Sequence, residues 1–273
     1  MFGAVAGDII GSVYERHPIK TVEFPLFQAE SRFTDDTVLS VATAFALMEK
    51  RGYAESFRSF GRRYPDAGYG QSFLRWLFES HCRPYGSWGN GAAMRVSPLG
   101  FALESVEEVL REAKKSAEVT HDHPEGIKGA QAAALAVFLA SAGTDKPTLR
   151  EEISGRFGYD LSRTTDQIRP AYGFEVSCQK SVPEAIIAFL DSTDYEDAVR
   201  RAVSLGGDSD TLACIAGAIA HAYYRKIPEK IVREVRLRLP EEFLGIIDRF
   251  EIYSKAEHRK NPPGGTATEK SFS

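Results

Sequence analysis

The stretch that decides the fold begins at residue 205 and reads Leu205-Gly206-Gly207-Asp208-Ser209-Asp210-Thr211-Leu212, followed by Ala213-Cys214-Ile215-Ala216-Gly217-Ala218-Ile219-Ala220. Its glycine pair permits a close approach of backbone that a side chain would block. Asp208 or Ser209 can cap the apolar helix that follows, so the loop ends at a helix N-terminus. Capping explains one acid but not two. With the Thr211 hydroxyl, the two acids offer three hard oxygen donors, which suit a small divalent cation.

The same chemistry occurs once more, at Thr34-Asp35-Asp36-Thr37, again directly before an apolar helical run. Each stretch taken alone also fits an ordinary helix cap, because Asp and Thr are preferred cap residues. Capping does not require adjacent acids twice in one chain. We therefore predict that the fold closes the two stretches into one oxygen-rich metal site.

The composition is that of an ordinary globular protein. The 273 residues are 43% apolar and 26% charged, and the net charge of −4 provides no basic field for nucleic acid or anionic membrane. No run approaches the length of a membrane span, and the N-terminus lacks the pattern of a signal peptide. The three cysteines (Cys82, Cys178 and Cys214) lie far apart. They are typical of reduced thiols, so we expect a cytoplasmic protein. From the net charge and the lack of a membrane span we expect neither nucleic-acid nor membrane partners.

The N-terminal segment carries glycines at every fourth position, Gly3, Gly7 and Gly11. This spacing predicts a helix that runs to about Glu15 and packs closely against a neighbouring helix. Asp8 lies among small apolar residues of that helix, where an acid is costly unless paired, so we expect a buried hydrogen-bonding role. Glu15 shares its helix face and, at the helix end, can face a site. Residues 16–33 contain two prolines and are predicted to form a loop.

Helical spacing of apolar residues dominates the rest of the chain. It predicts helices at 36–51, 53–64, 71–80, 105–118, 124–142, 148–157, 183–191, 194–204, 209–225, 228–237 and 240–250. There is neither an alternating strand pattern nor a repeat of fixed period. We therefore predict an all-α fold with one compact multi-helix domain over residues 1–255 and a polar, disordered tail over 256–273.

Two loops carry candidate ligand-binding residues. In Gly89-Asn90-Gly91, followed by small helix-compatible residues, free backbone N–H groups can face a phosphate, with Arg95 adding a charge-assisted contact, although a plain turn is the simpler interpretation. His121 is a candidate hydrogen-bond donor to substrate, whereas we expect His123 to be structural. The irregular stretch 143–182 has aromatic residues that could cover an adenine, but core packing is the expected use.

Five motifs in this order resemble the ADP-ribosylglycohydrolase family, which includes the dinitrogenase-reductase-activating glycohydrolase. They cover roughly residues 1–225 and are specific only as a set: Gly7-Asp8…Gly11…Glu15, Thr34-Asp35-Asp36-Thr37, Gly89-Asn90-Gly91…Met94-Arg95, Thr120-His121…Pro124 and Gly206-Gly207-Asp208-Ser209-Asp210-Thr211. The resemblance implies an all-helical enzyme that hydrolyses the glycosidic bond between ADP-ribose and an acceptor. Its substrate would be an ADP-ribosylated protein or a small ADP-ribosyl compound.

The resemblance also implies a role for individual residues. Two Mg²⁺ or Mn²⁺ ions, which activate water and hold the distal ribose, would be bound by Thr34, Asp35, Asp36, Asp208, Asp210 and Thr211. Glu15 and Asp35 would be the catalytic residues. The phosphates and ribose would be held by Gly89, Asn90, Gly91, Ala92, Met94 and His121.

Charge supports this assignment, because four aspartates carry −4 and two divalent ions +4. Six protein groups leave open positions on both ions for water or substrate hydroxyls. Two other functions use the same features. A metal-dependent nucleotide phosphohydrolase would release phosphate or pyrophosphate, and a non-catalytic ADP-ribose-binding module would bind without turnover.

Overall fold

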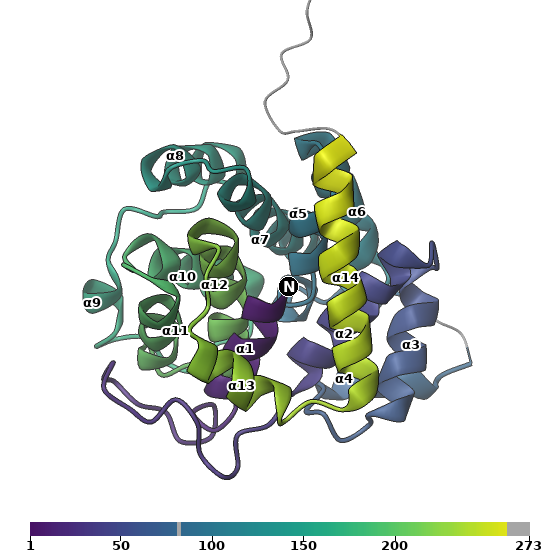
Figure 1. Cartoon of the computed structure of the whole chain (residues 1–273), viewed down its shortest axis with the longest axis horizontal. Helices are drawn as coiled ribbons and strands as arrows, with labels where there is room; N and C mark the ends of the chain where they lie inside the picture. Colours follow the sequence, from purple (N-terminus) through teal and green to yellow (C-terminus); the bar gives the residue numbers. More distant parts are fainter. Residues whose placement is uncertain (81–82, 261–273) are drawn as a thin grey trace, which may run out of the picture.

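The glycine-rich helix α1 (Phe2–Gly11) packs backbone to backbone against α12 (Ser209–Tyr224) at the centre of the computed structural model (Figure 1). A Cβ atom added to Gly7 would lie 2.0 Å from the carbonyl oxygen of Ala213, and one added to Gly3 would lie 2.4 Å from that of Gly217. The predicted packing role of these glycines is therefore confirmed. Because the two helices touch, Asp8 in α1 is brought beside the first turn of α12.

The structure describes residues 1–80 and 83–260, with side chains up to residue 256. Over these residues it is helical and contains no strand, so the all-α prediction is confirmed. The other helices are α2 (Asp35–Met48), α3 (Tyr53–Arg63), α4 (Gln71–Phe78), the 3₁₀ turn η1 (Asn90–Ala92), α5 (Ser97–Ala102), α6 (Val106–Glu118), α7 (Pro124–Ser141), α8 (Lys146–Phe157), α9 (Thr165–Ile168), α10 (Cys178–Leu190), α11 (Tyr195–Ser204), α13 (Glu229–Arg236) and α14 (Glu241–Lys260).

The central pair divides the remaining helices into two groups (Figure 1). Helix α12 packs against α7, α10 and α11, whereas α2 packs against α3, α5 and α14. Helix α1 contacts both α12 and α2, so it joins the groups. The acid motifs at the starts of α2 and α12 consequently lie next to each other, beside α1. None of the described helices combines the length and apolar character needed to cross a lipid bilayer.

Helix α1 ends at Gly11, four residues before the predicted end at Glu15. The Ser12 hydroxyl donates to the carbonyl oxygen of Ile9 (3.0 Å) in the last turn, and the chain leaves the helix through turns. Gly11 cannot carry a side chain here, because a Cβ would lie 2.4 Å from the carbonyl oxygen of Ser209. The expectation that Asp8 and Glu15 share one helix face is therefore wrong.

Other helix ends differ from the predicted ones where tertiary packing overrides local signals. Helix α10 begins at Cys178 and includes Pro183, although the proline was predicted to start the helix. Helix α5 was not predicted. Helix α14 continues to Lys260, and its buried Phe243, Ile247 and Phe250, with the partly buried Tyr253, pack it along the body of the domain. It thus enters the stretch predicted as a tail, and residues 261–273 of that stretch lie outside the described part.

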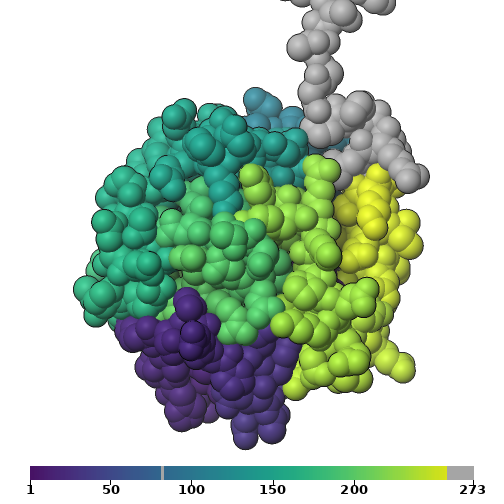
Figure 2. Space-filling view, turned by 60° about the vertical axis from the view of Figure 1, so that its left-hand side comes forward, coloured from purple at the N-terminus to yellow at the C-terminus, as the bar shows by residue number. Residues whose placement is uncertain are grey.

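The irregular segment between α1 and α2 is held by cationic side chains that donate to its carbonyl groups. Arg200 of α11 donates to the carbonyl oxygens of Val22 (3.0 Å) and Phe24 (2.8 Å). Arg238 donates to that of Ser31 (3.2 Å). Figure 2 shows this segment in purple, lying against green atoms of the C-terminal half. The segment is therefore anchored to the domain although it has no regular structure.

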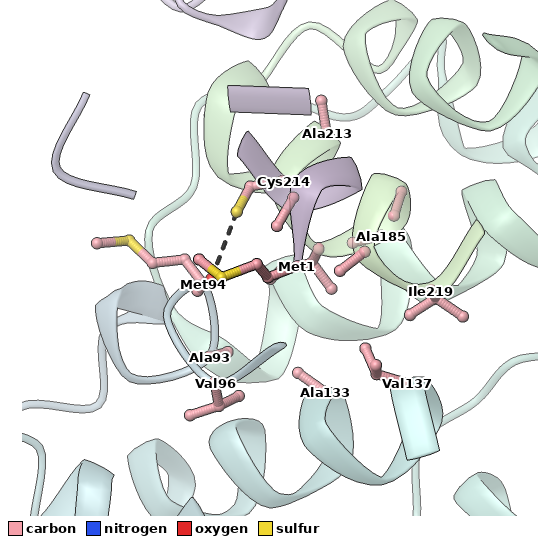
Figure 3. Close-up of a cluster of buried hydrophobic side chains, with 14 of the residues drawn as sticks. Met1, Ala93, Met94, Val96, Ala133, Val137, Ala185, Ala213, Cys214 and Ile219 are labelled. Carbon is pink, nitrogen blue, oxygen red and sulfur yellow. Dashed lines mark hydrogen bonds between the residues drawn. The ribbon is translucent and has the colours of Figure 1, made fainter. Parts of the chain in front are cut away.

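The core continues directly beneath the glycine loop. The Cys214 thiol of α12 donates to the carbonyl oxygen of Met94 (3.3 Å), and Ala93 and Val96 are buried near Ala133 of α7 (Figure 3). The loop is consequently supported from below by apolar packing.

Candidate active site

A cavity of about 650 Å³ opens where the acid motifs meet, within the size range of small-molecule sites. Its wall includes both acid motifs, the glycine loop, His121 and part of the irregular segment that follows α1. The lining residues that carry the argument below are Glu15, Arg16, Arg32, Thr34, Asp35, Asp36, Gly89, Asn90, Gly91, Met94, His121, Phe174, Val176, Asp208, Asp210 and Thr211.

Asp8 organises the first acid motif from below. Its carboxylate accepts hydrogen bonds from the backbone N–H of Thr34 (2.9 Å) and Thr37 (3.1 Å), and from the Thr34 hydroxyl (2.7 Å) and the Thr37 hydroxyl. The predicted buried hydrogen-bonding role of Asp8 is confirmed. Burial raises the pKa of Asp8 to about 6, although these four hydrogen bonds favour the charged form.

The second acid motif meets the first at the start of α12, as predicted. The Thr211 hydroxyl donates to Oδ2 of Asp36 (3.2 Å), which links the two motifs directly. Carboxylate oxygens of Asp8, Asp36 and Asp210 lie within 4.8 Å of one another. Oxygens of Glu15, Asp208 and Asp210 form a second group of the same size. Asp210 belongs to both groups, so the carboxylates form one continuous cluster.

The cluster concentrates negative charge, and none of its carboxylates forms an ion pair with a lysine or arginine of the described residues. Burial, followed by repulsion from neighbouring carboxylates, raises the pKa values of Asp35, Asp36 and Asp210 well above the ordinary value. Oδ1 of Asp36 is buried and has no hydrogen-bond partner among the described residues. Buried acceptors are normally satisfied, and hard divalent cations prefer carboxylate oxygens. The donor set therefore fits such ions.

Of the remaining predicted metal ligands, Thr34 and Thr211 contact the cluster, whereas Asp35 belongs to neither carboxylate group and its role as a ligand stays a prediction. The hydroxyl protons of Thr34 and Thr211 point to carboxylates, which leaves oxygen lone pairs for a cation. Asp35 is half-buried, and its backbone N–H donates to the carbonyl oxygen of Ala67 (2.9 Å). Its Oδ1 lies 3.4 Å from the position of a Cβ on Gly68, a lining residue with a φ of +110°. The carboxylate thus lies beside a cavity wall without a side chain.

The glycine loop is a 3₁₀ turn, not the start of an α-helix. The backbone N–H groups of Asn90, Ala92, Ala93 and Met94 donate to protein carbonyls, whereas that of Gly91 has no acceptor among the described residues. The sequence predicts that backbone N–H groups of this loop face a phosphate, and the structure leaves that of Gly91 available to a ligand. Ala92 is fully buried and does not line the cavity.

The side chain of Asn90 joins the glycine loop to the acid cluster. Its Nδ2 donates to Oδ2 of Asp208 (2.8 Å) and to the Ser181 hydroxyl (3.3 Å). The backbone N–H of Asn90 donates to the carbonyl oxygen of Val176 (2.7 Å), which holds the loop against the segment before α10. Asn90 therefore connects a carboxylate of the second motif to the loop that the sequence assigns to phosphate.

Arg95 lies behind the loop as a fully buried lining residue of the cavity, and its Nε and Nη1 have no hydrogen-bond partner among the described residues, so the expected contact with a phosphate stays a prediction. Its guanidinium carbon lies 4.4 Å from the centre of the Phe57 ring. Its Nη2 donates to the carbonyl oxygen of Ser116 (2.7 Å) and to Oγ1 of Thr120 (3.0 Å). Arg95 thereby fixes Thr120, the residue before His121.

This contact favours one of the two neutral forms of His121, the one with the proton on Nε2. Thr120 Oγ1 accepts from Arg95, so we assign its own proton to Nδ1 of His121, 2.8 Å away. Burial and the charge of Arg95 lower the pKa of His121 well below its ordinary value, so the ring is neutral and Nε2 carries the proton. Nε2 lies 3.1 Å from the position of a Cβ on Gly91, so this donor faces the glycine loop. His123 caps α7, as expected.

Phe174 and Val176 line the cavity with 65% and 47% of their surface exposed. The expectation that the aromatics of this stretch serve core packing is therefore wrong for Phe174, whereas Tyr172 packs against Gly207. The sequence also missed the inclusion of Asp8 in the carboxylate cluster. Its position on a glycine-lined helix face, which demands contact with another helix, was the signal for it.

Comparisons with known proteins agree with the geometry. A family model described as ADP-ribosylglycohydrolase matches residues 1–261. The chain is 29% identical to "ADP-ribosylhydrolase ARH3" of Mus musculus, over 83% of this chain and 84% of that protein. It is 26% identical to "ADP-ribosylarginine hydrolase Tri1" of Pseudomonas putida, over 82% and 69% respectively. A solved structure titled "ADP-ribosylglycohydrolase-related protein complex" superposes with a TM-score of 0.72 and 26% identity, covering 93% of this chain and 95% of that one.

Proposed function

The chain belongs to the ADP-ribosylglycohydrolase family, and from this premise we propose that it hydrolyses the glycosidic bond between ADP-ribose and an acceptor side chain of a modified protein. The observation that carries the proposal is the carboxylate cluster. Two acid motifs, whose Asp36 and Thr211 are 175 residues apart, share one cavity with Glu15, and a buried oxygen of Asp36 has no hydrogen-bond partner among the described residues. A structural cap at either helix would require neither the shared cavity nor the unpaired oxygen.

The cluster is suited to two Mg²⁺ or Mn²⁺ ions, held by Thr34, Asp35, Asp36, Asp208, Asp210 and Thr211. When bound, such ions supply Lewis-acid activation of water and ligation of ribose hydroxyls. Their charge of +4 would balance the four aspartates. Asp8 and Asn90 act one layer further out, because they fix Thr34 and Asp208 by hydrogen bonds.

The ADP portion extends from the cluster along the glycine loop. Gly91 N–H and the Nε2–H of His121 provide two neutral donors for diphosphate oxygens at one place. A neutral histidine keeps its role as a donor above its lowered pKa. Phe174 and Val176 offer an exposed apolar surface on which an adenine ring can stack.

Glu15 acts at the scissile bond. Its carboxylate groups with Asp208 and Asp210, and burial raises its pKa, with the charge of Asp208 adding to the rise. At the anomeric carbon the transition state carries positive charge, which a carboxylate at this position stabilises. The same group can accept the proton that the attacking water loses. Asp35, half-buried at the cavity wall, shares the catalytic role as a second carboxylate.

The function is tested with ADP-ribosyl peptides in Mg²⁺ or Mn²⁺, with mass analysis of the products. We expect intact ADP-ribose and unmodified peptide. Release of phosphate or AMP would favour a nucleotide phosphohydrolase, and tight binding without products would favour an ADP-ribose-binding module.

Two variants examine the assignment of residues. Asp36→Asn should lose Mn²⁺ binding in calorimetric titration, because it removes a charge from a site balanced at neutrality. Glu15→Ala should lower the single-turnover rate by about 10²-fold or more while Mn²⁺ affinity changes little. Glu23→Ala, an exposed acid of the same segment, is the matched control and should match the parent. A normal rate for Glu15→Ala would exclude it from the chemistry.

A further inference from the structure

The glycine pair of the second acid motif lies between two other segments of the chain. A Cβ atom on Gly206, whose φ is +66°, would lie 2.7 Å from the carbonyl oxygen of Ile19. A Cβ atom on Gly207 would lie 2.5 Å from Cε1 of the Tyr172 ring. The loop that leads into α12 is therefore held between the irregular segment that follows α1 and the segment that precedes α10.

One ammonium group joins all three segments. Nζ of Lys20 donates to the carbonyl oxygen of Tyr172 (2.5 Å) and to that of Leu205. In the part of the chain that the structure describes, no other side chain of residues 16–21 makes a hydrogen bond to a different segment. The later part of this irregular segment is fastened separately, by two arginines of other elements. The stretch directly after Glu15 therefore depends on Lys20 for its side-chain hydrogen bonds to the rest of the domain.

The joined segments carry carboxylates that repel each other. Oxygens of Glu15 and Asp208 belong to one group within 4.8 Å. Burial raises the pKa of Glu15, and the charge of Asp208 raises it further. Like charges this close push their segments apart unless other contacts hold them. Arg16 and Arg32 oppose the rise in pKa through their charge. Lys20 does not line the cavity, so its contribution comes from the backbone carbonyls that it joins.

We propose, on the basis of the proposed function, that Lys20 is a positioning residue for the hydrolysis. By joining the segment of Glu15 to the loop of Asp208, it holds these two carboxylates together at the reacting centre. Its ammonium forms no ion pair with a carboxylate among the described residues, so its donors remain committed to the two carbonyl oxygens. Loss of these donors should therefore slow the reaction without a matching loss of overall stability.

Two variants of Lys20 separate its donors from its bulk. Lys20→Met keeps the length of the side chain and removes the donors, whereas Lys20→Arg keeps a charged donor group. Lys226→Met is the matched control, because Lys226 is exposed, lies outside the cavity and makes no hydrogen bond or ion pair with the described residues. The single-turnover rate and the half-saturating peptide concentration are measured with an ADP-ribosyl peptide at saturating Mn²⁺. Hydrogen exchange of the metal-free protein, Mn²⁺ titration and Tm are measured on the same samples.

We expect Lys20→Met to lower the single-turnover rate about 10-fold, because a misplacement of roughly 1 Å can cost up to about 10²-fold. The half-saturating peptide concentration should stay nearly unchanged, since the change acts on the transition state and not on peptide binding. Mn²⁺ affinity should fall less than the rate does, because Asp36 and Asp210 lie in helices that Lys20 does not contact.

The other measurements locate the effect of Lys20→Met. Hydrogen exchange should become faster in residues 16–24, 168–176 and 203–208 and stay as in the parent elsewhere. Tm should remain close to that of Lys226→Met, because Lys20 is exposed. Lys20→Arg should recover most of the rate and of the protection from exchange.

A parent-like rate in Lys20→Met would overturn the inference while leaving the proposed function intact. Equal losses of rate in Lys20→Met and Lys20→Arg, without faster exchange in the three segments, would also overturn it, because the donors would then not be the cause. Absence of turnover in the parent would refute the proposed function and, with it, a role of Lys20 in hydrolysis. Hydrogen exchange would then still show whether Lys20 joins the three segments.

Discussion

Replacing Gly7 with alanine should lower the stability of the protein and weaken metal binding at the carboxylate cluster. A Cβ at this position would lie 2.0 Å from the Ala213 carbonyl oxygen and 2.4 Å from its carbonyl carbon. Real Cβ contacts are essentially never shorter than 3.0 Å, so α1 and α12 must separate by about 1 Å. The obstructing atoms are backbone and cannot rotate away. We therefore expect the free energy of unfolding to fall by at least about 3 kcal/mol, the upper end of overpacking effects.

The loss is large compared with the 5–15 kcal/mol that stabilise a typical domain. It corresponds to a fall in Tm of roughly 6–12 °C for a protein of this size. Because α1 carries Asp8 and α12 begins with the second acid motif, the separation should also weaken Mn²⁺ binding at least tenfold.

Urea denaturation and calorimetric titration measure the two effects on one sample. Gly155→Ala is the control, because an added Cβ there meets nothing within 4 Å and the glycine lies inside α8. It should stabilise the protein by about 0.5–1 kcal/mol. If Gly7→Ala is within about 0.5 kcal/mol of the parent, the two helices are not held at backbone contact and the reasoning fails.

Three further predictions concern the cavity. Gly91→Val should weaken ADP-ribose binding about tenfold or more in calorimetry, because an added Cβ lies 3.1 Å from Nε2 of His121. The Mn²⁺ affinity of this variant should stay within about twofold of the parent. If it binds ADP-ribose as tightly as the parent, the loop is a plain turn. Thr120→Val should move the ring proton of His121 from Nε2 toward Nδ1, visible in ¹⁵N NMR shifts, and Thr120→Ser should restore the parent spectrum; an unchanged spectrum in Thr120→Val contradicts the assigned tautomer. The carboxylate cluster should stabilise the metal-free protein less as the pH rises from 5 to 8. Asp8, with a pKa of about 6, and the other carboxylates with raised pKa values bind more protons when folded than when unfolded, so this stability is lost as the pH rises through the folded pKa values. The increase in Tm that saturating Mg²⁺ causes should therefore grow from pH 5 to pH 8, because this difference cancels the opposite contributions of His121, His221 and the N-terminal amine, whose pKa values burial lowers. An increase in Tm that does not depend on pH would refute the uncompensated cluster.

The sequence by itself determined the fold class, most helices and the two acid motifs. These features depend on local chemistry: apolar spacing, cap residues, and hard oxygen donors grouped at Thr34–Thr37 and Asp208–Thr211. The glycine spacing in α1 likewise indicated close packing, because only small residues allow two helix backbones to touch. The order of the motifs was sufficient to identify the family.

Only the tertiary structure decided how these parts act together. The end of α1 at Gly11, and with it the position of Glu15, depends on contact with Ser209 almost 200 residues later. The burial of Arg95 and the proton position on His121 depend on hydrogen bonds to other segments. Local sequence specifies which groups are present, but long-range packing sets their solvent exposure and their neighbours, and these determine what each charge can do.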